Sequence, residues 1–292
     1  MIKILITGGR GFIARNLAEQ LSGDFEVFSP GRNDLDLLNT EKVCEFLKKE
    51  KFDAIIHAAN YDADMAYSLK DPALVLEYNL KMFYNIARCE NDFGKLLFFG
   101  SGAEFGRQHW IPKMKEDYFD HFVPEDQYGL SKYIMTKQAL LSKNIINLRL
   151  FGVFGKYDDW QRRFIPNLCS FAIHDMPLKI SQNRRFDFLY VDDLAQITKW
   201  FVLNKPEKKV YNICSGQVWD FETVAEKIKI ISGKDLGIVV KQQGSGVEYS
   251  GDNSLLVNEI CGLKFTSFDD ALTDTYNWYR EHKAEIDKDK LL

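Results

Sequence analysis

A glycine-rich turn directly after the first apolar run constrains the fold of this chain more than any other feature. Residues 2–6 predict a buried strand, a helical pattern covers residues 12–21, and the run TGGRGFIA at residues 7–14 joins them. Glycines at such a turn let the backbone approach a pyrophosphate, which the positive end of the helix attracts. We therefore predict a dinucleotide site rather than a merely structural turn, with four loop residues at the cofactor: Gly8, Gly11, Phe12 and Ile13.

The first half of the chain alternates further apolar runs with helical patterns. Strands are predicted at residues 26–28, 54–57, 96–99 and 145–150, and helices at residues 40–50, 71–89 and 128–141. This alternation predicts the α/β class, as a Rossmann-type doubly wound parallel sheet with a smaller C-terminal substrate-binding lobe. After Gly155 the rhythm is less regular. We expect residues 1–155 and 186–213 to form the NADP-binding domain, and residues 156–185 and 214–292 to form the lobe.

Composition narrows the class of protein. Hydrophobic residues make up 46% of the chain and charged residues 27%, the balance of a globular protein, and the net charge is −4. No basic tail is present, so nucleic acid is not an expected partner. The five cysteines lack a CxxC pair and the five histidines lack ligand spacing, which argues against a disulfide framework and a metal site. A strand predicted from residue 2, and no apolar run near the roughly 18 residues of a membrane helix, favour a cytoplasmic protein.

The end of the second predicted strand bears on which dinucleotide binds. NAD sites usually carry an acidic residue there to hold the ribose hydroxyls, but this chain continues Phe28-Ser29-Pro30-Gly31-Arg32. Arg32, together with Arg10 in the glycine loop, offers two guanidiniums that suit a 2′-phosphate. We therefore predict that NADP(H) is the cofactor. The alternative is that Arg10 and Arg32 are only solvated surface residues. Asp36, with Leu37 beside it, is placed to meet the adenine, unless its carboxylate is simply solvated.

Seven motifs in order carry a resemblance to a known family. They are TGGRGFIA at 7–14, His57-Ala58-Ala59, Asn79, FGSGAEFG at 99–106, YGLSK at 128–132, RLFGVFG at 149–155 and FLYVDD at 188–193. With them the chain resembles the extended short-chain dehydrogenase/reductases, the NAD-dependent epimerase/dehydratase family, over nearly all of its length. It is most similar to the GDP-fucose synthase branch of nucleotide-4-ketosugar reductases. In that branch, arginines for the NADPH phosphate lie where this chain has Arg10 and Arg32.

The candidate catalytic residues are Ser101, Tyr128 and Lys132. Tyr128 and Lys132 are four residues apart on a predicted helix and share one face. A neighbouring ammonium favours the phenolate, which brings proton transfer by a tyrosine closer to neutral pH. The resemblance implies that Tyr128 donates the proton to a ketone, that Lys132 also holds the nicotinamide ribose, and that Ser101 hydrogen-bonds the carbonyl oxygen. By themselves, Tyr128 and Lys132 would also fit an ordinary surface pair, and Ser101 would also fit an ordinary cap.

The resemblance implies further residues beside the cofactor. Ala58 and Ala59 follow the third predicted strand and are expected to contact it. His57, just before them, is expected to line the cofactor path without an acid–base role. Asn79 is expected either to hold backbone near the cofactor, at a distortion of the sheet, or to be an ordinary interior residue of its helix.

Departures from the family's patterns narrow the chemistry. Its sugar 4,6-dehydratases carry an Asp-Glu pair directly after the active hydroxyl residue, where this chain has Gly102-Ala103. GDP-fucose synthase has a cysteine and a histidine where this chain has Ala103 and, by our alignment, Arg163. An alanine transfers no proton and an arginine stays protonated. Neither loss of water nor epimerisation beside a ketone is therefore expected, and simple reduction remains.

The residues that bind the substrate are harder to predict. The family often has an arginine for the diphosphate just before residues 187–190, but this chain has Phe186 there, preceded by Arg184 and Arg185. Gly152 replaces an asparagine that is common in related enzymes. The candidate substrate contacts are Ser101, Gly102, Asn167, Arg184 and Arg185.

These observations lead to one main hypothesis and two alternatives. The main hypothesis is an NADPH-dependent 4-reductase of a nucleotide-linked 4-keto-6-deoxysugar in surface polysaccharide biosynthesis, with a GDP-linked substrate favoured and CDP-, dTDP- and UDP-linked sugars left open. The alternatives are a nucleotide-sugar 4-epimerase that retains NAD, and a non-catalytic dinucleotide sensor. The resemblance also implies a homodimer in which helices 71–89 and 128–141 of two subunits form a four-helix bundle.

Overall fold

The central element of the structure is a parallel sheet. The computed structural model describes residues 1–63 and 70–291. Within them, six strands form the sheet in the order β2 (Glu26–Phe28), β1 (Lys3–Thr7), β3 (Ala54–His57), β4 (Lys95–Ser101), β5 (Ile145–Leu150) and β9 (Val210–Ile213). The chain runs outward from β1 to β2 and then returns to β3 on the other side of β1. In a doubly wound sheet, ligands bind at such a reversal, outside the carboxyl ends of the strands.

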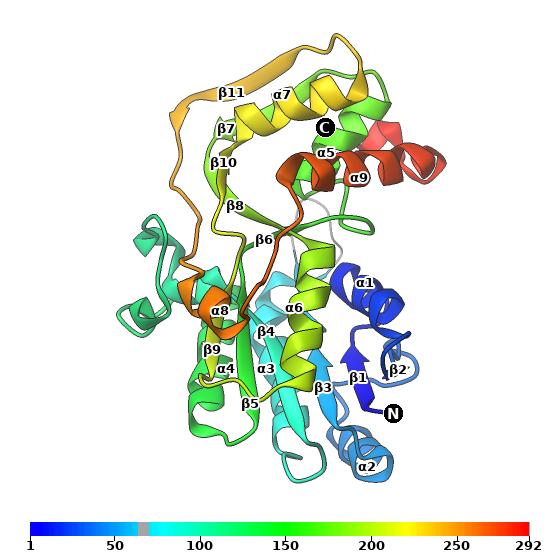
Figure 1. The fold of residues 1–292 in the computed structure, drawn as a ribbon, viewed down its shortest axis with the longest axis vertical. Coiled ribbons are helices and arrows are strands. Elements are labelled where there is room, and N and C mark those ends of the chain that lie inside the picture. Colours follow the sequence, from blue (N-terminus) through cyan, green and yellow to red (C-terminus); the bar gives the residue numbers. More distant parts are fainter. Residues whose placement is uncertain (64–69, 292) are drawn as a thin grey trace.

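Helices cover both faces of this sheet (Figure 1). One face carries α1 (Phe12–Leu21) and α6 (Val191–Leu203), and the other carries α2 (Thr40–Glu50), α3 (Val75–Ala87) and α4 (Gln127–Leu141). Neighbouring residues of β1 point to opposite faces, so Ile4 and Ile6 pack toward α1 and α6 while Leu5 packs toward the other helices. Both faces are apolar, which matches the near-continuous hydrophobic strands of the sequence. The predicted fold class is confirmed.

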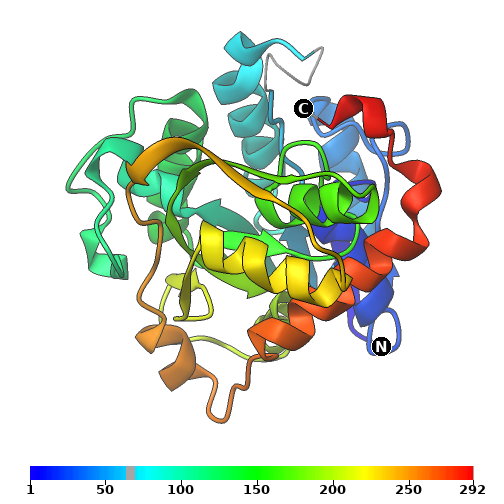
Figure 2. The same cartoon turned by 90° about the horizontal axis from the view of Figure 1, so that it is seen from above.

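A smaller lobe stands over the carboxyl ends of the main strands (Figures 1 and 2). Its strands pair as β10 (Val218–Asp220), β8 (Arg185–Tyr190) and β6 (Gly152–Phe154) in one small sheet, and as β11 (Ile238–Ser245) and β7 (Leu178–Asn183) in another. Its helices are α5 (Phe164–Ile173), α7 (Phe221–Ser232) and α9 (Phe268–Glu281). These elements share a separate apolar core. The active-site region is therefore expected between this lobe and the sheet.

The two units exchange segments along the chain. Strand β8 pairs with β6 and β10, whereas α6 and β9, which follow it, belong to the main sheet and its covering layer. Helix α8 (Ser254–Glu259) also packs into the main core, through Leu256. We therefore keep two assignments as proposals. Cofactor binding is proposed for residues 1–155 and 186–213, and substrate binding for residues 156–185 and 214–292.

Two features are absent from residues 1–63 and 70–291. No helix there combines the length and apolar character needed to cross a bilayer. No group of three or more His, Cys, Asp or Glu side chains in the same ranges is placed to hold a metal ion. The five cysteines are free, although the sulfurs of Cys44 and Cys89 lie 2.9 Å apart.

Candidate active site

The glycine loop between β1 and α1 has a shape that only glycine permits at two positions. Gly8 has a φ of +75°, and a Cβ there would lie 2.8 Å from the Cα of Ala59. A Cβ on Gly9 would lie 2.3 Å from the carbonyl oxygen of Ser29. Gly11 is the N-cap of α1, and its N–H donates to the Gly8 carbonyl at 2.7 Å. The loop thus holds backbone close around an exposed helix N-terminus, which suits a pyrophosphate.

The structure brings the two predicted phosphate arginines to the same corner. Arg10 is exposed, and its Nε lies 3.1 Å from the position that a Cβ on Gly31 would take. Arg32 is also exposed, and its Nε lies 3.7 Å from a carboxylate oxygen of Asp36. The hydroxyl of Ser29, beside the glycine loop, is buried without a hydrogen-bond partner among the described residues. Two exposed guanidiniums and a glycine cradle fit an anionic dinucleotide.

The ends of β1 and β3 form the floor of this site. The Thr7 hydroxyl contacts Nδ1 of His57 at 2.9 Å and accepts the N–H of Ala59 at 3.1 Å. Burial, together with the nearby charge of Lys132, lowers the pKa of His57 to about 3. His57 is therefore a neutral structural residue. Ala58 lies between it and Ala59 and is half-buried.

Asn79 lies in α3 and fixes the segment that follows β3. Its amide oxygen accepts the N–H of Tyr61 at 2.8 Å, and its amide nitrogen donates to the carbonyls of Tyr61 and Val75. These backbone groups occupy both polar atoms of the buried side chain. The geometry agrees with the backbone-holding alternative for Asn79.

Ser101, Tyr128 and Lys132 converge at the carboxyl end of β4. Ser101 is the last residue of β4, and its hydroxyl accepts the N–H of Ala103 at 3.2 Å. Tyr128 lies in the first turn of α4, whose N-cap is Asp126. Burial raises the pKa of Tyr128, whereas a hydrogen bond with the Ser101 side chain and the positive charge of Arg163 lower it. At neutral pH the phenol is therefore protonated, the state that a proton donor requires.

Lys132 is buried one helical turn after Tyr128. Its Nζ lies 5.7 Å from the centre of the Tyr128 ring and donates to the Phe99 carbonyl at 3.0 Å. Burial lowers the pKa of Lys132 to about 8, and the carboxylate of Glu104 opposes that shift. The ammonium is thus retained at neutral pH, close to the phenol that it would stabilise as a phenolate.

Glu104 fixes the backbone at Ser101 from inside the core, a role that was not predicted from the sequence. One carboxylate oxygen accepts the N–H of Ser101 at 2.8 Å. The other accepts the Thr136 hydroxyl at 2.8 Å and Nε of Arg149 at 2.9 Å. Neither Glu104 nor Arg149 is exposed to solvent. The buried pair ties the end of β4 to α4 and β5, and Glu104 is in no position to act on a substrate. The sequence does contain a signal for this contact, because a glutamate three residues after an N-cap serine is typical of a capping box.

Two aromatic residues cover the other side of Ser101, and they too were missed. The Trp110 indole donates to the Gly102 carbonyl at 3.0 Å. The ring of Tyr249 lies 4.2 Å from that of Trp110, and a Cβ on Gly102 would lie 2.6 Å from a ring carbon of Tyr249. Gly102 is therefore required by a side chain that arrives from the C-terminal part of the chain, which no local pattern indicates.

The predicted substrate contacts are dispersed. The Asn167 amide donates to the Trp160 carbonyl at 3.0 Å and holds that loop. Arg184 and Arg185 are exposed on β8 and the turn before it, and Arg185 lies 3.4 Å from Glu248. Phe186 packs against Tyr249, with ring centres 5.2 Å apart. Arg163, the N-cap residue of α5, acts on Tyr128 through its charge, so the structure brings it toward the catalytic group.

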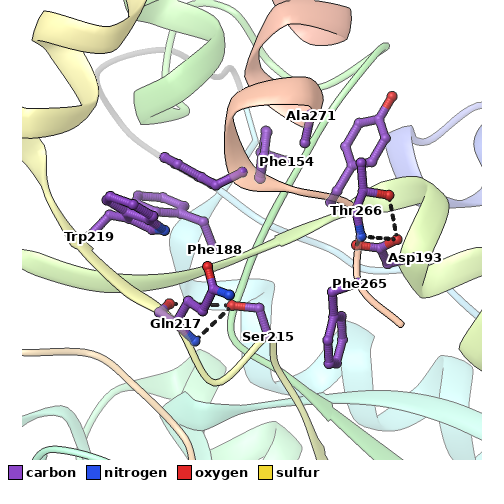
Figure 3. A pocket seen from close by; sticks show the side chains of 11 residues that line it. Phe154, Phe188, Asp193, Ser215, Gln217, Trp219, Phe265, Thr266 and Ala271 are labelled. Carbon is purple, nitrogen blue, oxygen red and sulfur yellow. Dashed lines mark hydrogen bonds between the residues drawn. The ribbon is translucent and has the colours of Figure 1, made fainter. Parts of the chain in front are cut away.

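A small pocket elsewhere is distinct from this site (Figure 3). It lies among β6, β8, β10 and the start of α9. In it, the carboxylate of Asp193 accepts the N–H and hydroxyl of Thr266. Its lining contains none of the predicted catalytic or cofactor residues. We assign the candidate active site to the glycine loop and the end of β4, because the reactive groups converge there.

Comparison with known proteins places this geometry in context. The family model described as "NAD dependent epimerase/dehydratase family" matches residues 4–214. That range extends from the first strand through Ser101, Tyr128 and Lys132 to the end of β9.

Individual proteins match over most of the chain. GDP-L-colitose synthase of Yersinia pseudotuberculosis is 26% identical, covering 95% of this chain and 92% of that protein. GDP-L-fucose synthase of Azorhizobium caulinodans is 36% identical, covering 67% of this chain and 69% of that protein. Among solved structures, a GDP-mannoheptose C4 reductase from Campylobacter jejuni with NADP bound superposes with a TM-score of 0.83 at 22% identity, covering 96% of this chain and 98% of that one. This last likeness concerns the fold.

Proposed function

The chain belongs to the NAD dependent epimerase/dehydratase family, and we propose that it is an NADPH-dependent reductase of a nucleotide-linked 4-keto-6-deoxysugar. The observation that carries the proposal is the convergence of Ser101, Tyr128 and Lys132 at the same edge of the parallel sheet as the glycine loop. A GDP-linked sugar is favoured, because the relatives named above are synthases of GDP-linked sugars. We place the reaction in surface polysaccharide biosynthesis in the cytoplasm, and CDP-, dTDP- and UDP-linked sugars are the alternative substrates.

The corner formed by Arg10 and Arg32 supports NADPH as the cofactor. β2 ends without an acidic residue, and both guanidiniums are exposed beside the glycine loop. Arginine binds a 2′-phosphate through charge-assisted hydrogen bonds, whereas an acidic residue would repel it. Gly8, Gly11, Phe12 and Ile13 would hold the pyrophosphate, and Asp36, Leu37, Ala58 and Ala59 would line the rest of the cofactor path.

The three catalytic side chains divide the work of reduction. Bound NADPH supplies the hydride. Tyr128 donates its phenol proton to the carbonyl oxygen of the sugar, which becomes a hydroxyl. Lys132 stabilises the phenolate that remains. Its ammonium has three N–H donors, and because only one of them is used by the Phe99 carbonyl, the others can bind the nicotinamide ribose. Ser101 holds the carbonyl oxygen and stabilises the negative charge that develops on it.

The residues next to Ser101 favour reduction without inversion of the neighbouring carbons. Inversion beside a ketone needs a base on one face of the sugar and an acid on the other. Ala103 is buried and carries no titratable group, and Glu104 is locked in its ion pair with Arg149. Arg163, near Tyr128, remains a cation. The charge of Arg163 suits the substrate's diphosphate instead, with Arg184 and Arg185 as further candidates.

The test is turnover of a GDP-linked 4-keto-6-deoxysugar in heavy water with unlabelled NADPH. We expect NADPH to be consumed, with no enzyme-dependent deuterium at C3 or C5 relative to an enzyme-free control. Deuterium at either carbon would show that another group acts as a base. Purification with tightly held NAD⁺, and conversion of a nucleotide sugar without added cofactor, would favour the 4-epimerase. Cofactor binding without turnover of any of the four nucleotide classes would favour a sensor.

We also propose a homodimer. α3 and α4 lie side by side on one face of the main sheet, and Leu140 and Leu141 at the end of α4 are exposed. Pairing these helices with their counterparts would form a four-helix bundle. Sedimentation of the purified protein tests the proposal.

A further inference from the structure

Two cysteines of the main domain lie in direct contact. Cys44 belongs to the middle of α2, and Cys89 follows the last turn of α3. The S–H of Cys89 donates to the sulfur of Cys44, and the two sulfurs are 2.9 Å apart. Helices α2 and α3 share one apolar core on the same face of the main sheet, so their packing holds the thiols together. Bonding the two sulfurs would shorten the distance between them by less than about 1 Å.

The two sulfurs differ in their access to solvent. Cys44 is half-buried, whereas Cys89 is buried. Burial and the adjoining Cys44 sulfur raise the pKa of Cys89, so this residue is a protonated thiol at neutral pH. A thiolate, and not a thiol, attacks a disulfide. Cys44 is therefore the sulfur that meets an oxidant first, and Cys89 is placed to attack second, the arrangement of an accessible cysteine beside a resolving one.

We propose that Cys44 and Cys89 form a reversible disulfide site that takes a low-molecular-weight disulfide as its oxidant. The Cys44 thiolate attacks one sulfur of the oxidant, forms a mixed disulfide and releases one thiolate, which takes up the proton that Cys44 lost to water. Cys89 then attacks the sulfur of Cys44, and its proton passes to the second departing thiolate. Two protein thiols are oxidised, and one small disulfide is reduced to two thiols.

The contacts one turn earlier on both helices show what the bond would do. Asn85 donates to the Leu37 carbonyl at 2.8 Å and accepts the Thr40 hydroxyl at 2.9 Å. Thr40 and Cys44 are four residues apart, as are Asn85 and Cys89, so each pair shares one face of its helix. The bond between Cys44 and Cys89 would thus extend an existing connection of α2 to α3 by one turn. We infer that it staples the two helices in the arrangement that they already have.

The other three cysteines provide the comparison. Cys169 and Cys214 are buried, each in a different apolar cluster, and Cys261 is exposed. The proposed bond is therefore a single one between two neighbours, of the transient kind found in reducing compartments, and not part of a disulfide framework.

The first test treats the purified protein with oxidised glutathione and maps its tryptic peptides by mass spectrometry without reduction. We expect residues 43–48 linked to residues 89–95, which carry Cys44 and Cys89, and loss of the link after treatment with dithiothreitol. Wild-type protein in which Cys44 keeps a glutathione, or in which Cys261 alone reacts, would overturn the proposal.

Two variants sharpen this test. In Cys89→Ser the second attack is missing, so we expect Cys44 to keep its bound glutathione. Cys261→Ser is the matched control, because it removes an exposed cysteine outside the pair, and it should form the same linked peptides as the wild type. A Cys89→Ser protein without the adduct would show that Cys44 is not the attacking sulfur and would contradict the proposed order of steps.

The second test compares the Tm of the oxidised and reduced proteins. A bond from residue 44 to residue 89 closes a long loop and restricts the unfolded chain. We expect the oxidised protein to melt about 4–8 °C higher, with no such shift in Cys44→Ser treated in the same way. An unchanged or lower Tm in protein that carries the linked peptides would overturn the stapling role.

Neither of these tests needs a substrate, so both decide the proposal even if the proposed function fails. A third measurement rests on the proposed cofactor. Because the bond leaves the contact of Asn85 with the Leu37 carbonyl in place, the oxidised protein should bind NADPH as tightly as the reduced protein. Weaker binding after oxidation would contradict the inference that the helices keep their arrangement.

Discussion

The two ends of the predicted cofactor site are built in opposite ways. At the chemical end, Lys132, Glu104 and Arg149 are buried and hydrogen-bonded before any ligand arrives. At the phosphate end, Arg10 and Arg32 are exposed, and the shape comes from glycines. A buried charge network fixes geometry at a high cost in desolvation, whereas exposed arginines gain order only when the anion binds. The chemical end should therefore govern rate and stability, and the phosphate end cofactor choice.

The largest effect is expected from Tyr128→Phe. Removing the proton donor should lower kcat by about 10²- to 10⁴-fold, the usual contribution of general acid–base catalysis. The affinity for NADPH should stay near that of the wild type, measured by fluorescence titration. Tyr133→Phe, on the solvent side of the same helix, is the control. A Tyr128→Phe protein with normal turnover would show that the proton comes from another group.

The next largest effect concerns stability at the chemical end. Glu104→Gln leaves Arg149 buried without its counter-ion, so we expect the free energy of unfolding to fall by about 3–5 kcal/mol. Asp120→Asn removes an exposed ion pair with Lys137 and should leave the free energy of unfolding almost unchanged, because water and salt screen such a pair. Urea denaturation measures both. Equal losses of stability in the two variants would mean that burial does not make the Glu104–Arg149 pair more important than the Asp120–Lys137 pair.

The pH dependence of reduction should follow Lys132. Its pKa is lowered to about 8 by burial, so the ammonium that stabilises the Tyr128 phenolate is lost as the pH rises through that value. We expect kcat to fall over the same range. The Glu104 carboxylate opposes the lowering, so in Glu104→Gln the fall should begin at a lower pH. If kcat falls at the same pH in Glu104→Gln as in the wild type, Glu104 has no electrostatic influence on Lys132.

At the phosphate end we expect changes of affinity alone. Arg10→Ala and Arg32→Ala should each weaken NADPH binding by about 10-fold, the low end for a charge-assisted hydrogen bond, because both side chains are exposed. NADH binding and the urea midpoint should not change. Arg88→Ala, an exposed arginine at the end of α3, is the control. Parallel losses for NADH and NADPH would remove the argument for the 2′-phosphate.

The smallest effect should come from the Arg32–Asp36 pair. Asp36→Asn keeps an acceptor for the Leu38 N–H but releases Arg32 from a carboxylate 3.7 Å away. Exposed pairs contribute about 0.2–1 kcal/mol, so NADPH should bind about two- to threefold tighter. Weaker binding would indicate that the carboxylate serves the adenine more than it restrains the arginine.

What could be predicted from the sequence follows the range of the interactions involved. Strand β3 and helix α1 have the bounds that periodicity predicts, because local pattern decides them. The helix predicted at 71–89 begins with a separate 3₁₀ turn, Pro72–Leu74, before α3. Helical spacing predicts that Tyr128 and Lys132 share one face of α4, and the family resemblance predicts that they meet Ser101 at the end of β4. The position of Tyr249 was not predictable, since it reaches Gly102 only through pairing with β8, and pairing between distant segments leaves no local signal.

The late arrival of β9 has a consequence for how the chain folds. β5 is fully buried, and one of its edges pairs with β9, whose residues lie about sixty positions further along the chain. Until residues 210–213 leave the ribosome, that edge is an unpaired apolar strand, the kind of surface that recruits other strands and promotes aggregation. The N-terminal half contains every proposed catalytic group, and folded by itself it would expose this unpaired strand edge. We therefore expect chaperones to matter most before β9 has been synthesised.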